Sequence, residues 1–295
     1  MCDEQTPLVT GARLQGQTIH RRTLGKLGVG LALAAMLPHV AHAEDVVAQD
    51  VRVTTPDGEA DCYFVHPTVG SHAAVIFWPD IFGVRESSRQ MATRLAESGY
   101  AVLVVNPYYR TLKGQLLPEG TMMIDSEMFS EVLPKAYKLA GTLSPETCVS
   151  DGRALVEYLD AQPAVDAQRK IGVMGYCMTG SYAFRLAAAI PERNGAGASF
   201  HGGGLVTEDP ASPHRLIPQI KAGMLVAIAE DDDQKELEAK NILREAFAEA
   251  GVVAEVEVYQ GAKHGWCPPD MAVYDPALAE RAWTRMLKLY SAQLS

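Results

Sequence analysis

Short apolar runs alternate along this 295-residue chain with longer segments of helical periodicity, and this alternation constrains the fold more than any other feature. Continuous apolar runs of about four to eight residues are typical of strands that are buried on both faces. Strands of this kind pair in parallel, and parallel pairs need long crossover connections, which are usually helices. The pattern therefore predicts a single α/β domain with a mostly parallel sheet and helices on both faces.

The expected elements follow from the positions of these runs. Buried strands are expected at residues 73–78, 101–106, 170–174, 197–200, 223–229 and 253–259. Helices are expected at residues 85–98, 147–161, 179–190, 235–250 and 276–291. Two earlier strands, at 51–54 and 61–66, meet at the turn signal Pro56-Asp57-Gly58. Residues 111–143 are irregular and then helical from 126 to 140, and we interpret them as an insertion over the sheet edge.

The first 43 residues carry the pattern of an export signal. Arg21 and Arg22 precede an apolar run from Leu27 to Leu37, and Ala41-His42-Ala43 forms a small-x-small cleavage site. The paired arginines resemble a twin-arginine signal, an address that a receptor reads. A membrane anchor is the alternative, but Pro38 ends the run well short of the roughly 20 residues that a span needs. We expect cleavage after Ala43, a folded domain over residues 44–295, and a periplasmic or secreted protein.

Charge and residue content limit the classes of molecule that this protein is expected to bind. The net charge of −10 repels nucleic acid and anionic lipid, and the first 43 residues contain more bases than acids. We therefore expect a monomer or small homo-oligomer that binds neither nucleic acid nor, after cleavage, a membrane. No metal-ligand cluster or phosphate-binding glycine loop predicts a metal or a cofactor. The pattern leaves open whether Cys62, Cys148 and Cys267 form disulfides.

Cys177 is the candidate nucleophile. It stands in Gly175-Tyr176-Cys177-Met178-Thr179-Gly180, after an expected strand and before an expected helix rich in alanine. This is the context of a nucleophile elbow, in which the reactive residue occupies a tight strand-to-helix turn. The usual motif has glycine two residues after the nucleophile, where this chain has Thr179. A buried structural cysteine is the alternative interpretation.

A catalytic thiol needs a base, and His264 has the right place in the chain. It follows the last expected strand and precedes the last helix, where an α/β-hydrolase carries its histidine. The orienting acid is expected between Cys177 and His264, directly after the strand that ends at Ala229. Four acids, Glu230 to Asp233, follow it, and spacing alone does not choose among them. A solvated loop is the alternative for these acids, and a surface loop for the histidine.

Several of these segments together resemble the dienelactone hydrolase family. They are Gly175-Tyr176-Cys177, Pro79–Val84, Asn106-Pro107-Tyr108-Tyr109-Arg110, the loop after Ala229, and Lys263-His264-Gly265. The resemblance extends over roughly residues 50–290. It implies an α/β-hydrolase with a Cys-His-Asp triad that cleaves a small ester or lactone through an acyl-enzyme, as a carboxymethylenebutenolidase does. It also implies that Asp232 is the triad acid, with Asp231 as the alternative.

The resemblance assigns further roles. The family carries an acid near the thiol at the position of Asp80, although usually the longer Glu, and a satisfied structural carboxylate is the alternative. Backbone N–H groups of Ile81 and Met178 would form the oxyanion hole. Arg110 falls on one of two arginine positions that grip a substrate anion, whereas Pro268 occupies the other.

Two further residues lie near these motifs in the sequence. Arg85 is a candidate to replace the missing arginine, or else a surface residue at the start of a helix. His201, followed by three glycines, is expected on a flexible pocket rim in contact with substrate. Two rival functions stay open, namely a general periplasmic carboxylesterase or thioesterase, and a thiol or binding protein that has lost catalysis.

Overall fold

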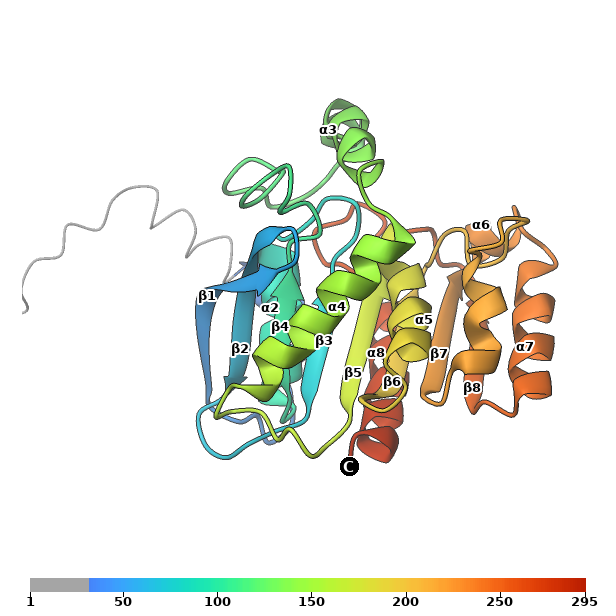
Figure 1. Cartoon of the computed structure of the whole chain (residues 1–295). Helices are drawn as coiled ribbons and strands as arrows, with labels where there is room; N and C mark the ends of the chain where they lie inside the picture. The colour runs from blue at the N-terminus through green and yellow to red at the C-terminus, as the bar shows by residue number, and fades with distance from the viewer. Residues whose placement is uncertain (1–31) are drawn as a thin grey trace, which may run out of the picture.

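An eight-stranded sheet forms the centre of the structure, a computed structural model that describes residues 32–295 (Figure 1). Strand β2 is antiparallel to both β1 and β4, and all other neighbours are parallel. The expected single α/β domain with a mostly parallel sheet is confirmed. In sheet order the strands are β1 Val46–Thr55, β2 Gly58–Pro67, β4 Ala101–Val105, β3 Ala74–Trp78, β5 Ile171–Tyr176, β6 Asn194–Phe200, β7 Gly223–Ala229 and β8 Ala254–Tyr259.

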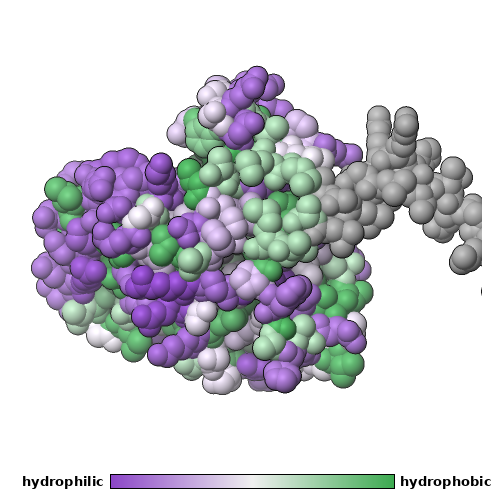
Figure 2. Space-filling view, turned by 180° about the vertical axis from the view of Figure 1, so that it is seen from behind, coloured by the Kyte–Doolittle hydropathy of each residue, from purple (hydrophilic) through white to green (hydrophobic). Residues whose placement is uncertain are grey.

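Helices cover both faces of this sheet. On one face α4 (Pro145–Asp160), α5 (Gly180–Ala189) and α7 (Ala239–Ala250) pack against it, and on the other α2 (Glu86–Glu97) and α8 (Pro276–Gln293). Seen from behind, hydrophilic residues dominate the end of the molecule that carries α7 (Figure 2). None of the described helices is both long enough and apolar enough to cross a membrane.

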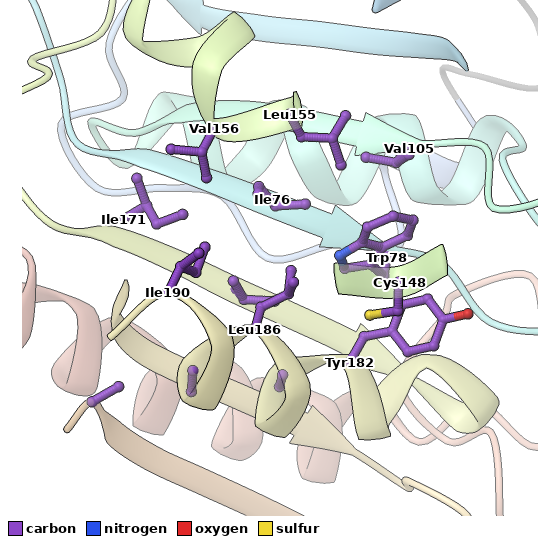
Figure 3. Close-up of a cluster of buried hydrophobic side chains, with 14 of the residues drawn as sticks. Ile76, Trp78, Val105, Cys148, Leu155, Val156, Ile171, Tyr182, Leu186 and Ile190 are labelled. Atoms are coloured by element: carbon purple, nitrogen blue, oxygen red, sulfur yellow. The ribbon is translucent and has the colours of Figure 1, made fainter. Parts of the chain in front are cut away.

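Alternation along the strands builds the two cores. In β3, Ile76 and Trp78 enter the core beneath α4 and α5, whereas Val75 and Phe77 enter the core beneath α2 and α8. Figure 3 shows Ile76 and Trp78 facing Leu155 of α4 and other side chains of the first core. Each such side chain stabilises the fold by roughly 1.5–3 kcal/mol when it is fully buried. Because both faces are covered, β3 and β4 consist of apolar residues without interruption.

The insertion forms a cap above the carboxyl ends of the strands. Helix α3 (Ser126–Ala140) lies there (Figure 1), as the sequence predicted. It begins where the Asp125 side chain accepts a hydrogen bond from the Met128 N–H, and Pro134 lies inside it. A third apolar cluster beneath the cap includes Ile81, Tyr108 and Leu139, and Cys177 packs against it. The cap therefore covers the end of the sheet at which the candidate nucleophile lies.

The structure differs from several of the expected elements, and β1, for example, begins at Val46, five residues before its expected start. The helix expected at 235–250 begins four residues later, as α7 at Ala239, and a short α6 (Glu230–Asp233) precedes the expected range. A 3₁₀ helix at Pro213–Gln219 was not predicted, because prolines at its start and inside it disguise helical periodicity. Strand β6 starts at Asn194, three residues early, because the small residues that precede its apolar run also fit a buried strand.

Part of the expected export signal lies outside the described residues, which begin at residue 32. Within the described part, Leu33 is fully buried and the Tyr274 hydroxyl donates a 3.2 Å hydrogen bond to the Met36 carbonyl. The division between residues 43 and 44 therefore stays a prediction.

Candidate active site

The elbow after β5 holds Cys177 in a strained backbone conformation. Its φ is +57°, in the left-handed region that residues with a side chain avoid. A Cβ atom on Gly175 would lie 2.0 Å from the Thr179 carbonyl oxygen, and one on Gly180 would lie 2.6 Å from the Gly202 Cα. Glycine is therefore required on both sides of this turn. Strain at one residue between such glycines is typical of a functional turn.

Thr179, which departs from the usual motif, has a structural role in the elbow. Its buried hydroxyl accepts a hydrogen bond from the Tyr176 N–H at 3.0 Å and lies 2.9 Å from the carbonyl oxygens of Trp78 and Pro79. The hydroxyl thus ties the elbow to the end of β3. Glycine, which the usual motif has at this position, would lack these bonds. Threonine therefore strengthens the turn.

The structure brings Cys177, His264 and Asp232 together. The Cys177 Sγ lies 3.1 Å from His264 Nε2, and His264 Nδ1 lies 2.6 Å from Asp232 Oδ2. Both distances are those of hydrogen bonds. The arrangement can remove a proton from the thiol and stabilise the imidazolium that results.

Each of the four acids after β7 has a different partner. Asp231 accepts the backbone N–H of His264 at 2.8 Å, so it holds the loop, whereas Asp232 reaches the ring. Glu230 accepts the backbone N–H of Gly261 at 3.0 Å, and Asp233 pairs with Lys240 at 2.7 Å. The geometry therefore matches the role expected for Asp232 rather than its alternative, Asp231.

The electrostatics of the site favour an ion pair. Burial lowers the pKa of His264, but hydrogen bonds to Asp232 and Cys177 outweigh it and raise that pKa to about 10. Burial also acts against the charge of Asp232, yet its pKa is lowered by His264 and, further out, by Lys235. The thiolate is the reactive form of a cysteine, and the Cys177 Sγ lies within hydrogen-bond distance of this ring.

The two expected oxyanion residues lie on adjacent loops and share one contact. The hydroxyl of Tyr108 donates a 2.8 Å hydrogen bond to the Ile81 carbonyl and lies 3.5 Å from the Met178 sulfur. Tyr108 is 1% exposed, within the cluster beneath the cap. It therefore fixes the distance between the loop after β3 and the elbow.

Asp80 is held by an arginine and does not bond the thiol. Its carboxylate accepts the Phe82 N–H at 2.9 Å and two bonds from Arg85, at 2.7 and 2.9 Å. Arg85 also bonds Asp270. The expectation of a surface position for Arg85 is wrong, because Arg85 is only 4% exposed. Sequence periodicity around the start of α2 does not reveal the two carboxylates that bury it.

Arg110 is also paired with carboxylates. It bonds Asp151 at 2.7 and 2.9 Å and Asp57, in the β1–β2 turn, at 2.7 and 2.9 Å. These four bonds use most of its five N–H donors. A contact of Arg110 with substrate stays a prediction, and it would compete with these ion pairs.

His201 is inside the protein beside His264. Its ring is 4.9 Å from that of His264 and 5.3 Å from that of Trp266, and the residue is 1% exposed. Burial, and then the charge of His264, hold its pKa well below the usual range, so the ring is neutral. Neither ring nitrogen has a hydrogen-bond partner within the described part of the chain. Contact of His201 with substrate stays a prediction.

A pocket of about 210 Å³ opens beside Met178. It lies between the end of α3, the start of α4, and α5, with Leu143, Tyr182 and Arg185 in its lining. Sequence reasoning missed this pocket, together with Tyr108 and Asp270. Tyr108 belongs to a segment already singled out, and Asp270 follows His264 by six residues, but nothing local marks either as part of the site.

The remaining cysteines are buried and unpaired. Among residues 32–295, Cys62, Cys148 and Cys267 are free thiols, which answers the question of pairing that the sequence left open. Burial raises the pKa of each. Within the same range, no group of three acidic, histidine or cysteine side chains is arranged to hold a metal ion.

Together the sheet, the elbow and the loops at its carboxyl end define an α/β-hydrolase. The chain belongs to the dienelactone hydrolase family, whose pattern it matches over residues 60–294. It is therefore a hydrolase of ester or lactone bonds.

Individual relatives agree with this assignment. The chain is 26% identical to a carboxymethylenebutenolidase of Pseudomonas putida over 222 residues, which are 75% of this chain and 86% of the relative. It also resembles the crystal structure of a dienelactone hydrolase-like promiscuous phosphotriesterase from metagenomic libraries, with 23% identity and a TM-score of 0.67. That match covers 85% of this chain and 99% of the other. The dienelactone hydrolase of Anabaena variabilis has a TM-score of 0.57 at 18% identity, over 85% of this chain and 99% of the other.

Proposed function

We propose that this protein hydrolyses a small ester or lactone, in the manner of a carboxymethylenebutenolidase, through an acyl-enzyme on Cys177. The observation that carries the proposal is the unbroken series from Cys177 to His264 to Asp232, with spacings of 3.1 and 2.6 Å, at a strained elbow. A structural cysteine would need neither the strain nor the histidine.

The reaction follows from this geometry in two halves. The Cys177 thiolate attacks the carbonyl carbon, and the electron pair of the C=O bond moves to the oxygen, which faces the N–H groups of Ile81 and Met178. Each such donor lowers the barrier by about 3 kcal/mol. The tetrahedral intermediate collapses, the C–O bond to the leaving alcohol breaks, and the His264 imidazolium gives its proton to that alcohol.

Hydrolysis of the acyl-enzyme restores the site. Neutral His264 takes a proton from water as the water oxygen attacks the thioester carbon. The C–S bond then breaks, the carboxylic acid leaves, and the proton on His264 re-forms the ion pair with the thiolate. With a lactone, the alcohol released in the first half stays attached to the acyl group, so one product leaves instead of two.

The direct test is an assay of the chain from residue 44 onward against an enol lactone and p-nitrophenyl esters. We expect turnover of at least one of them, and loss of turnover in Cys177→Ser and His264→Ala. Hydrolysis at the wild-type rate in both variants would contradict the mechanism. Turnover of esters but never of lactones would favour the general carboxylesterase over the lactonase.

We also propose that the precursor is exported through its twin-arginine pattern and cleaved after Ala43. The support is the sequence of residues 1–43, since the paired arginines precede the described part of the chain. Expression in a bacterial host, followed by fractionation and N-terminal sequencing, tests this. A periplasmic product that begins at Glu44 is expected, and Arg21→Lys with Arg22→Lys should retain the precursor in the cytoplasm.

A further inference from the structure

Three buried charged side chains beside the site take no part in the chemistry described above. Asp80, Arg85 and Asp270 are 5%, 4% and 2% exposed. Arg85 donates to Asp270 at 2.6 and 3.0 Å, to Asp80 at 2.7 and 2.9 Å, and to the Gly83 carbonyl at 3.3 Å. Arginine has five N–H donors, and all five are used. Arg85 therefore has no donor left for a substrate carboxylate.

These three residues join the segments that make up the site. Asp80 and Arg85 lie at the two ends of the loop between β3 and α2, and Ile81 is inside that loop. Asp270 belongs to the same loop as His264, between β8 and α8. The backbone carbonyl of Asp270 also accepts the Ile124 N–H from the cap, at 2.7 Å.

We propose that Arg85, held by Asp80 and Asp270, is a positioning residue that sets the Ile81 N–H relative to the Cys177–His264 pair. The proposal rests on the proposed function. A planar guanidinium that forks onto two carboxylates fixes both the distance and the orientation of its partners. An oxyanion donor needs such control, because displacements of about 1 Å can reduce a rate about 100-fold. A lysine would keep the charge and lose the fork.

The protein contains a matched ion pair that lies elsewhere. Arg94 of α2 bonds both carboxylate oxygens of Glu280 in α8, at 2.9 and 2.7 Å, and lies over the Trp283 ring. Arg94 is 8% exposed, so it resembles Arg85 in burial, whereas its two bonds both come from Nη2 and its partner Glu280 is partly exposed. The Arg94–Glu280 pair joins two helices and no loop of the site. Variants of this pair therefore measure the effect of a lost ion pair on stability without moving the residues of the site.

The experiment compares Arg85→Lys and Asp270→Asn with Arg94→Lys and Glu280→Gln, using p-nitrophenyl acetate hydrolysis, iodoacetamide alkylation of Cys177 and thermal unfolding. For the first two variants we expect kcat to fall about 10- to 100-fold with KM within about threefold, since the loss is confined to the transition state. Alkylation should stay within about threefold, because it forms no oxyanion and depends on the thiolate. The two control variants should unfold at lower temperature and keep kcat within about twofold. Asp270→Glu, which retains the charge, should recover more of kcat than Asp270→Asn.

Several results would overturn the proposal. One is a kcat within twofold of wild type in both Arg85→Lys and Asp270→Asn, and another is an equal loss in Arg94→Lys. A fall in alkylation that parallels hydrolysis would mean that the ion pair supports the thiolate instead of the oxyanion hole. If Arg85→Lys does not fold, the proposal is tested by the Asp270 variants alone. If the wild-type protein shows no hydrolysis that depends on Cys177, the proposed function itself fails, and the two failures are thereby distinguished.

Discussion

Replacing Asp232 with asparagine is the perturbation that tests the site most directly. The carboxylate lies 2.6 Å from His264 Nδ1 and supports the charge of that ring. Asparagine keeps the size of the side chain and removes its charge. Asp231→Asn is a matched control, because the same change one residue earlier affects the 2.8 Å bond to the His264 backbone N–H and a 3.9 Å ion pair with Lys235, and leaves the bond to the ring in place.

The size of the effect follows from the pKa of His264. The difference between the ordinary 6.5 and about 10 corresponds to about 5 kcal/mol of preference for the imidazolium. Asp232 and Cys177 both contribute to this preference. About a third of the His264 side chain is exposed, so solvent screens part of the interaction. We therefore assign about 2 kcal/mol to Asp232, a factor of about 30. Misorientation of the ring increases the loss, toward the roughly 10⁴-fold known for the equivalent change in serine proteases.

The assay is the pH dependence of kcat/KM for ester hydrolysis. Acylation needs the imidazolium as the acid, so the wild-type rate should fall as the pH rises through about 10. In Asp232→Asn we expect a loss of about 30-fold to 10⁴-fold at neutral pH. The alkaline limb should move toward the ordinary value of about 6.5. A larger loss in Asp231→Asn, or an alkaline limb that does not move, would refute this reasoning.

Three further changes test other parts of the structure. Gly175→Ala places a Cβ 2.0 Å from the Thr179 carbonyl, so we expect a loss of stability of more than about 3 kcal/mol, measured by urea unfolding. Tyr108→Phe leaves the Ile81 carbonyl without its donor, and should lower kcat about 10-fold at nearly constant KM. Arg110→Gln leaves the buried Asp151 without its cation and should destabilise the fold by about 3 kcal/mol. Its KM for anionic and neutral esters should change equally.

Each of these expectations has a result that would contradict it. For Gly175→Ala it is a wild-type unfolding midpoint, and for Tyr108→Phe it is an unchanged kcat. If the KM of Arg110→Gln rises only for anionic esters, Arg110 binds substrate and the ion pairs seen here are exchanged for that contact.

Local sequence patterns specify the order of the elements and the position of the candidate nucleophile. Both depend on local patterns, namely apolar runs that fit strands buried on both faces and two glycines that permit a tight turn. The expected α3 and the expected turn at Pro56–Gly58 are found for the same reason. Where local signals were weak, as around residues 213–219 and 234–238, the expected boundaries were wrong.

Contacts between distant segments of the folded chain select which of four adjacent acids meets the histidine ring. Asp231 and Asp232 are equivalent in sequence, and they differ because the turn after β7 directs one carboxylate to a backbone N–H and the other to Nδ1. The burial of Arg85 by carboxylates 5 and 185 residues away in sequence was likewise invisible to any local pattern. Such contacts depend on loops from different strands meeting at one edge of the sheet, and side-chain pairing across those loops is a property of the folded chain alone.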